Sequence, residues 1–244
     1  MIKIFGLNIF TNSELNEQIT EIGNLTKVVS DLQIQVSNLN KQIYDLTKPK
    51  NPKEDYYNNK YPKIDLTYLR VETDGNYLVD IRNFFNLNDK TIPTVNGNTD
   101  DEKALNGLKW VISNITYTPD SSNDTYKVNE YWAYPYQTLK HKKGDCEDGA
   151  ILLANILVKS GVPYWKVRLN AGSVNGGGHA YVVYYCEEKD RWVVLDWCYW
   201  DNILPINERK DYKEESNYLG VWFSWNTLYC FSTGLNTQAK EFLK

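Results

Sequence analysis

Hydrophobic residues recur with a seven-residue period near the start of the chain, over residues 22–46. In each heptad a β-branched residue is followed three positions later by a leucine. The two sets are Ile22, Val29, Val36 and Ile43, and Leu25, Leu32, Leu39 and Leu46. This pairing favours a parallel two-stranded coiled coil. We therefore expect self-association through residues 22–46, most simply as a parallel dimer. The alternatives are a trimer, or an amphipathic helix packed on its own domain.

Prolines follow the heptads at positions 49, 52 and 62. Because proline ends helices, we expect an extended connector through about residue 63. Strand-like residues such as 77–81 come next, without an assigned role. The chain then divides into an N-terminal segment over 1–12, a coiled coil over 13–48, a linker and accessory segment over 49–98, and a main domain over 99–244.

The main domain contains hydrophobic patterns of both helices and strands. Apolar residues at helical spacing predict helices over 99–115 and 146–160, and polar residues 113–125 predict a loop. Runs of β-branched and aromatic residues predict strands over 165–169, 180–186 and 191–196, with a turn at 187–190.

Composition narrows the choice of partners. The net charge of −4 gives no electrostatic reason to expect nucleic acid, and no run of 18 apolar residues predicts a membrane span. The apolar start, Met1–Phe10, is short and lacks a small-residue cleavage site, so we expect no signal peptide. The compartment is then cytoplasmic or a virus particle.

Four cysteines occur without any C-x-x-C pair, which argues against structural zinc. Cys186, Cys198 and Cys230 are expected to be buried free thiols, with a disulfide as the alternative. Cys146 differs, because it stands at the first turn of the predicted helix over 146–160. Backbone N–H groups and the helix dipole stabilise a thiolate there.

A base for that cysteine can come from only two histidines, His141 and His179. His141 lies in a lysine-rich stretch, whereas His179 ends the glycine-rich loop 176–178 and opens a strand. The turn at 187–190 would set His179 opposite residue 198, so that Asp196 is its diagonal neighbour at about 7–8 Å between Cα atoms. Asp196 could then orient the imidazole. Cys146, His179 and Asp196 together suggest an acyl-transfer triad.

Acidic residues surround the cysteine. Asp145 is a good N-cap, and Asp148 three residues later completes a capping box. Negative charge beside the sulfur disfavours a thiolate, so a protonated His179 becomes more necessary. The carboxylates of Asp145, Glu147 and Asp148 could also hold a cation.

An oxyanion needs hydrogen-bond donors. The backbone N–H of Cys146 is one by position. A side-chain donor should come from upstream, where Gln137 is preferred and Trp132 is the other candidate, although Trp132 is more simply a packing residue.

The ordered motifs over about residues 100–199 resemble the transglutaminase-like superfamily, and most of all its bacterial cysteine peptidases. The matching residues are Trp132, Pro135, Gly144–Asp148, Gly178–Ala180 and Leu195–Asp196. The resemblance implies an α+β, papain-like core in which a helix bearing the cysteine packs on an antiparallel sheet bearing the histidine and the aspartate. It assigns Cys146 as nucleophile, His179 as base and Asp196 as orienting group. Some such relatives are calcium-dependent proteases, which implies calcium at Asp145, Glu147 and Asp148, although the triad itself requires no cofactor.

The leading interpretation is thus a cysteine hydrolase that cleaves a peptide or isopeptide bond through a thioester on Cys146. One alternative is acyl transfer from the same thioester to an amine. Another is a catalytically silent structural or assembly protein in which the coiled coil is the working part. Trp192, Trp197 and Trp200 flank the triad and could line a cleft or simply pack.

Overall fold

A computed structural model describes residues 2–4, 7–9, 12–47, 51–72, 75–122, 126, 128–199, 203–238 and 243. The chain forms two compact units, Met1–Lys48 and Pro49–Lys244. No helix in the described part is both long and apolar enough to cross a membrane.

The first unit consists of a short antiparallel hairpin and one long helix. Strands β1 (Ile2–Ile4) and β2 (Leu7–Ile9) pair with each other, and α1 runs from Asn12 to Thr47. The predicted helix is therefore confirmed. Its heptad side chains are exposed by 49–58% at Leu25, Val29, Leu32, Val36, Leu39 and Ile43. The coiled coil itself stays a prediction.

A six-stranded sheet forms the frame of the second unit, in the order β10-β9-β8-β11-β12-β3 with antiparallel neighbours. Its strands are β3 (Lys63–Ile64), β8 (Val167–Val174), β9 (Gly177–Cys186), β10 (Arg191–Leu195), β11 (Tyr218–Trp225) and β12 (Cys230–Gln238). Arg191 pairs with Cys186, and Leu195 with Val182. This is the register that the turn at 187–190 predicts.

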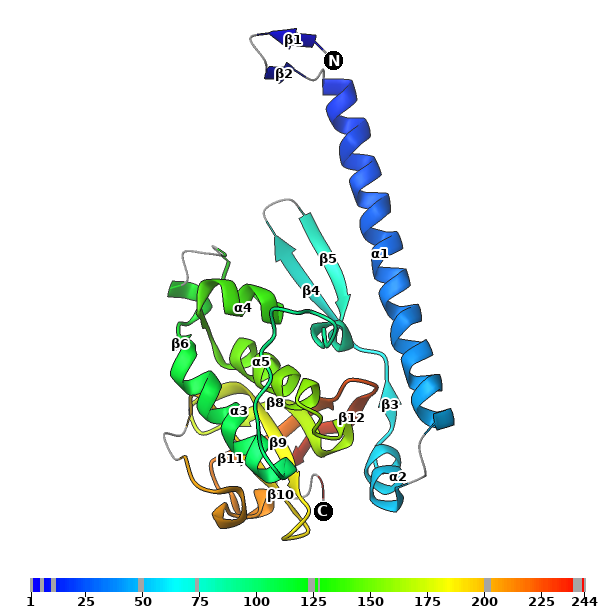
Figure 1. The fold of residues 1–244 in the computed structure, drawn as a ribbon. Helices are drawn as coiled ribbons and strands as arrows, with labels where there is room; N and C mark the ends of the chain where they lie inside the picture. Colours follow the sequence, from blue (N-terminus) through cyan, green and yellow to red (C-terminus); the bar gives the residue numbers. More distant parts are fainter. Residues whose placement is uncertain are drawn as a thin grey trace. The chain divides into compact units, whose positions relative to one another are not determined.

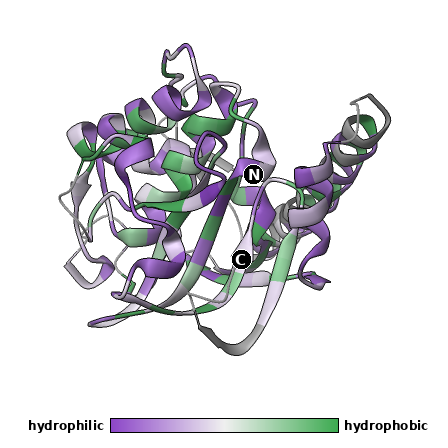
Figure 2. Ribbon diagram, turned by 90° about the horizontal axis from the view of Figure 1, so that it is seen from below, coloured by the Kyte–Doolittle hydropathy of each residue, from purple (hydrophilic) through white to green (hydrophobic). Residues whose placement is uncertain are grey.

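Helices α3 (Asp100–Asn114) and α5 (Cys146–Lys159) pack together, and α5 also packs on β8 and β9 (Figure 1). Thr99 caps α3 by accepting a hydrogen bond from the N–H of Glu102. The buried side of α5 meets the apolar face of the sheet in one core, with α5 residues such as Leu152 against strand residues such as Val182 and Leu195. Hydrophobic residues accordingly gather at the centre of this unit (Figure 2). The expected α+β class is confirmed.

Tyrosines fill the opposite face of the sheet. Tyr181, Tyr212 and Tyr218 are buried there, and the hydroxyls of Tyr181 and Tyr212 lie 2.6 Å apart. Two turns of 3₁₀ helix, η4 (Ile206–Glu208) and η5 (Tyr212–Glu214), lie in the loop that leads to β11. Shorter elements complete the region around α5. They are helix α4 (Pro135–His141), the parallel pair β6 (Thr116–Tyr117) and β7 (Lys143–Gly144), and the 3₁₀ helices η1 (Ile81–Phe84), η2 (Asp120–Ser122) and η3 (Tyr164–Lys166).

The predicted extended connector is wrong, because Pro52–Asn59 form helix α2. Asn51 is its N-cap, with a side-chain oxygen that accepts from the N–H of Lys53 at 3.0 Å. Pro52 occupies the first helical position, where its missing N–H costs nothing and its fixed φ suits the helix. A β-hairpin follows, with β4 (Thr67–Glu72) paired to β5 (Gly75–Asp80).

Smaller differences concern strand limits and cysteines. The strand predicted over 165–169 is β8, which begins only at Val167 and continues to Val174, and the loop predicted over 113–125 contains β6 and η2. All four cysteines are free thiols, and Cys186 and Cys230 are buried as expected. Cys198 is only half-buried, because it lies in the turn that leaves β10 and faces a pocket.

Candidate active site

Cys146 is the first residue of α5, at the end of β7. Its backbone carbonyl accepts a hydrogen bond from the indole Nε1 of Trp197 at 3.0 Å. The same indole lies against Gly149, where an added Cβ would stand 2.1 Å from Trp197 Cε2. Trp197 therefore fixes the first turn of α5 and is a packing residue rather than a cleft wall. The expected capping box is wrong, because Asp145 makes no side-chain capping bond to this helix.

His179 and Asp196 form a close pair below the surface. His179 Nε2 lies 2.6 Å from Asp196 Oδ2, and the two residues are 8% and 4% exposed. Burial alone would lower the pKa of His179, but hydrogen bonds to Asp196 and to the Cys146 thiol, together with their charges, raise the pKa to about 9. Since Nε2 faces Asp196, Nδ1 is the ring atom left for Cys146. The structure thus brings these three sequence-predicted residues together.

Asp196 is held by five donors, of which the thiol of Cys198, at 3.8 Å from Oδ1, is the most distant. Its Oδ1 accepts from the backbone N–H groups of Cys198 and Tyr199, both at 3.1 Å. Its Oδ2 accepts from the hydroxyl of Tyr218 at 2.7 Å in addition to His179. Burial works to raise the pKa of Asp196, but these partners outweigh it and lower the pKa below its ordinary value. Sequence reasoning missed Tyr218, which comes from β11, a strand that the pattern does not predict.

The second histidine lies elsewhere. His141 ends α4, where its ring meets the edge of Tyr126 at 5.9 Å between centroids. Burial and then the charges of Lys140 and Lys143 lower the pKa of His141. Its position gives it no part in the Cys146–His179–Asp196 group.

Gln137 has other partners. Its Oε1 accepts from the N–H of Tyr134 at 2.9 Å and from Arg70 Nη2 at 2.7 Å, and its Nε2 donates to the hydroxyl of Tyr131 at 3.0 Å. Both ends of the amide therefore hold the start of α4, and the expected role of Gln137 as an oxyanion donor gains no support.

Two further tryptophans pack rather than line the site, and one is not described. Trp132 stacks on Tyr68 and Trp225, at 4.9 Å and 5.6 Å between ring centroids. Trp192 is buried against Tyr57 and Tyr185. Trp200 lies outside the described residues.

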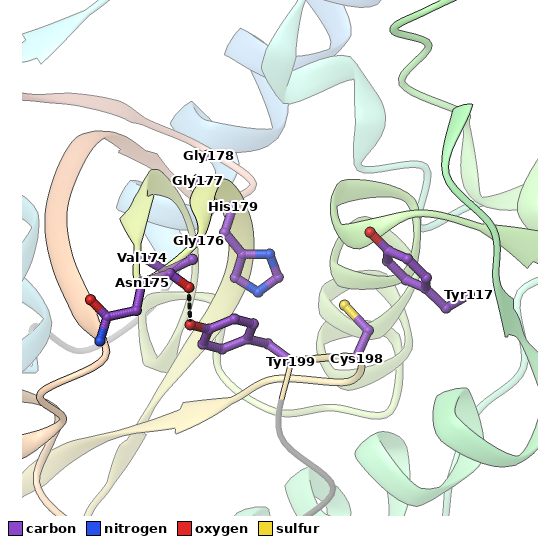
Figure 3. Close-up of a pocket in the computed structure, with 9 residues that line it drawn as sticks. All are labelled: Tyr117, Val174, Asn175, Gly176, Gly177, Gly178, His179, Cys198 and Tyr199. Carbon is purple, nitrogen blue, oxygen red and sulfur yellow. Dashed lines mark hydrogen bonds between the residues drawn. The ribbon is translucent and has the colours of Figure 1, made fainter. Parts of the chain in front are cut away.

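A pocket opens beside the imidazole (Figure 3). Its lining consists of Tyr117, Val174, Asn175, Gly176, Gly177, Gly178, His179, Cys198 and Tyr199. The hydroxyl of Tyr199 donates to the carbonyl of Asn175, and its ring lies 5.1 Å from that of His179. The pocket gives a reactant access to the imidazole from the side of the glycine-rich turn.

Carboxylates gather around the start of α5, next to Cys146. Asp120, Glu147 and Asp148 are at most 4% exposed, and oxygens of Asp120, Asp145 and Asp148 lie within 4.8 Å of one another. Burial, followed by the charges of neighbouring carboxylates, raises the pKa of Asp120 to about 7 and raises those of Glu147 and Asp148 well above their ordinary values.

Each of these four carboxylates has a buried oxygen without a hydrogen-bond partner among the described residues: Asp120 Oδ1, Asp145 Oδ1, Glu147 Oε1 and Asp148 Oδ2. Converging, dehydrated carboxylate oxygens are the ligands of a hard cation such as calcium, so the residues fit such an ion. Sequence reasoning missed Asp120, because it lies 25 positions before Asp145 in a stretch with the composition of an ordinary polar loop.

Comparison with solved structures finds similar chains. The chain is similar to the calcium-bound structure of LapG from Legionella pneumophila, with 24% identity over 56% of this chain and 73% of that chain and a TM-score of 0.39. The EGTA-treated structure of the same protein is 22% identical over 59% of this chain and 75% of that chain, with a TM-score of 0.42. Comparison with curated proteins gives no match.

Comparison with protein-family models identifies the family of this chain. The sequence model of the transglutaminase-like domain matches residues 86–216, which is more than half of the chain and includes Cys146, His179 and Asp196. The chain therefore belongs to the transglutaminase-like family.

Proposed function

We propose that this protein is a cysteine hydrolase that cleaves a peptide or isopeptide bond through a thioester on Cys146. The observation that carries the proposal is the buried His179 ring, which has Asp196 at Nε2, 2.6 Å away, and lies close enough to the Cys146 thiol for that group to raise its pKa. A pKa of about 9 keeps this imidazole protonated at neutral pH, so that it can act as the proton donor in the first half-reaction.

In the first half-reaction, Cys146 Sγ attacks the carbonyl carbon of the scissile amide. The backbone N–H of Cys146, at the helix start, is placed to donate to the developing oxyanion. His179 Nδ1 gives its proton to the leaving nitrogen, so that the C–N bond breaks and the thioester remains. Asp196 holds the ring orientation through Nε2 and stabilises its positive charge.

In the second half-reaction, neutral His179 takes a proton from water as its oxygen attacks the thioester. The C–S bond then breaks, and Cys146 returns to a thiolate beside the imidazolium. A primary amine in place of water would give a transglutaminase product from the same intermediate. Product analysis with added amine therefore separates hydrolysis from acyl transfer, and absence of both would favour a silent structural module.

We also propose that calcium binds at Asp145, Glu147 and Asp148, with Asp120 as a further ligand. The ion would neutralise carboxylates that are otherwise buried together and would fix the loop before α5. Its binding would also draw Glu147 away from the nucleophile, since the Cys146 thiol now donates to Glu147 Oε2 at 3.3 Å.

The exposed heptads of α1 support a third proposal, self-association as a parallel dimer. Six apolar side chains on one stripe stand about half exposed, and a second copy of the helix would cover them. Catalysis lies in the other unit, so the two properties should separate by mutation.

The hydrolase proposal is tested by digesting a proteome-derived peptide library with the protein and with Cys146→Ala. Mass spectrometry of labelled new N-termini should find recurrent cleavage by the unmodified protein and none by the variant. Equal cleavage by both proteins, or none by either with water or an amine as acceptor, would contradict the proposal.

A further inference from the structure

The strand that carries His179 has one partly open edge. β8 pairs with β9 from Gly177, opposite Val174, through to Tyr184. On the other side β10 reaches only Val182, opposite Leu195. Among the described strands, none continues this pairing over Gly177–Tyr181. The main chain next to His179 therefore has an edge at which another strand could add.

The pocket of Figure 3 lies along that edge. Gly176, Gly177 and Gly178 form one wall, and Cys198 and Tyr199 form the other, where the chain has left β10. A Cβ added at Gly176 or Gly177 would meet no atom within 4 Å, so it is their positive φ of 115° and 148°, rather than packing, that favours glycine in this turn. The absence of side chains also lets a foreign backbone come close to β9.

Trp222, on β11, places an exposed aromatic ring next to Gly178 of this pocket. Its indole is 51% exposed, and its backbone carbonyl accepts from Thr233 Oγ1 at 3.0 Å. The ring reaches across β8, so that a Cβ added at Gly178 would lie 3.0 Å from Trp222 Cη2. A large apolar surface thus stands in water beside the residue that precedes His179.

We propose that the substrate docks as an extended peptide strand on the open edge of β9 over Gly177–His179, and that Trp222 binds an apolar side chain of that strand. Main-chain hydrogen bonds to β9 would supply affinity, as in other cases of strand addition. Because Gly178 has no side chain, the substrate side chain opposite it can lie across the strand and contact the indole. The inference rests on the proposed function and names its substrate class: an unfolded or loop segment with an apolar residue near the scissile bond.

The test uses irreversible probes of Cys146, so it needs no natural substrate. Iodoacetamide reports the nucleophile alone, whereas acetyl-Leu-Leu-Gly and acetyl-Gly-Gly-Gly chloromethyl ketones must also dock. The unmodified protein should react faster with the leucine probe. Trp222→Ala should slow the reaction with the leucine probe by about 5- to 10-fold, as expected for losing the partial burial of one leucine side chain, while the iodoacetamide rate stays unchanged. Trp222→Phe should restore most of the loss.

Strand pairing is tested by methylating the probe's amide nitrogens one at a time. At least one methylated leucine probe should react about 10-fold more slowly, because it loses a hydrogen bond and crowds the edge. The matched control for Trp222→Ala is Tyr56→Ala, because Tyr56 is likewise an exposed aromatic residue, at 54%, but lies on α2. Its neighbour Tyr57 packs on Tyr185, near the far end of β9.

Equal loss with both kinds of reagent in Trp222→Ala, or no loss with either, would overturn the role of Trp222. Equal rates for the methylated and parent probes would overturn strand pairing. A protein whose Cys146 does not react preferentially with iodoacetamide would instead contradict the proposed hydrolase, so the two failures are distinguishable.

Discussion

Replacing Asp196 by asparagine isolates the charge that holds His179. The side chain keeps its size, and its oxygen can still accept from the N–H groups of Cys198 and Tyr199. The negative charge is lost, and an amide N–H₂ group now faces His179 Nε2. The pKa of His179 stands at about 9 against an ordinary 6.5, a preference for the charged ring of roughly 3 kcal/mol. Asp196 and Cys146 stabilise the charged ring, whereas burial of the ring favours its neutral form. Without Asp196, the effect of burial should be the larger one, and the His179 ring should be largely neutral at pH 7.

The expected result of Asp196→Asn is that alkylation of Cys146 by iodoacetamide at pH 7 slows by about 10- to 100-fold and its pH profile moves upward. Turnover should fall by about 10² to 10⁴, as in the serine triad. Peptide mapping by mass spectrometry gives the rate at each thiol, and circular dichroism checks the fold. Tyr218→Phe keeps the charge and removes only one donor, so its effect should be several times smaller. An unchanged rate and pH profile in Asp196→Asn would refute the role assigned to this carboxylate.

The hydrogen-bonded pair of His179 and Asp196 also predicts that the stability of the fold depends on pH. Because the pKa of folded His179 is raised to about 9, its stabilising contribution is fully present below the unfolded value of about 6.5. It should be lost as the pH rises through about 9. Urea unfolding across this window should show a fall in stability that is absent in Asp196→Asn, and parallel pH curves for both proteins would contradict the raised pKa.

Three other predictions concern the surroundings of the site and the helix of the first unit. Gly149→Ala should lower the free energy of unfolding by about 1–3 kcal/mol, since the new methyl group overlaps the indole of Trp197; an unchanged urea midpoint would mean that the indole moves freely. Calcium at a hundredfold excess over its Kd should raise the free energy of unfolding by about 2.7 kcal/mol, and Asp148→Asn should abolish most of the gain. A melting temperature that does not respond to calcium would contradict the proposed calcium site. The double variant Leu32→Lys and Leu39→Lys should be monomeric by light scattering with unaltered alkylation of Cys146, and a monomeric unmodified protein across micromolar concentrations would contradict self-association.

Local sequence pattern predicts much of the fold. The register of β9 and β10 follows from a four-residue turn, since a short hairpin loop fixes which residues oppose each other. That register alone is enough to place Asp196 within reach of His179. The start of α5 at Cys146 likewise follows from the apolar run behind it. By contrast, Pro52 suggests a helix breaker, although Asn51 before it makes it the first residue of a helix.

The parts that sequence reasoning missed depend on contacts between distant segments. Tyr218 reaches Asp196 only because β11 lies beside β8 in the sheet. Asp120 joins the carboxylates beside Cys146 from a loop with no distinctive composition. Gln137 is occupied by Arg70, which comes from a hairpin 67 residues earlier. No spacing rule links such residues along the chain.

Competition among the four thiols for limiting iodoacetamide tests the central claim, an activated nucleophile at Cys146, most directly. Burial raises the pKa of Cys186 to about 11 and of Cys230 to about 12, and burial with the charges of Asp196 and Cys146 also raises that of Cys198. These three thiols should therefore lag at neutral pH while Cys146, paired with His179, is alkylated first. Peptide mapping that finds slow, uniform labelling of all four, or Cys198 ahead of Cys146, would contradict an activated nucleophile at this position.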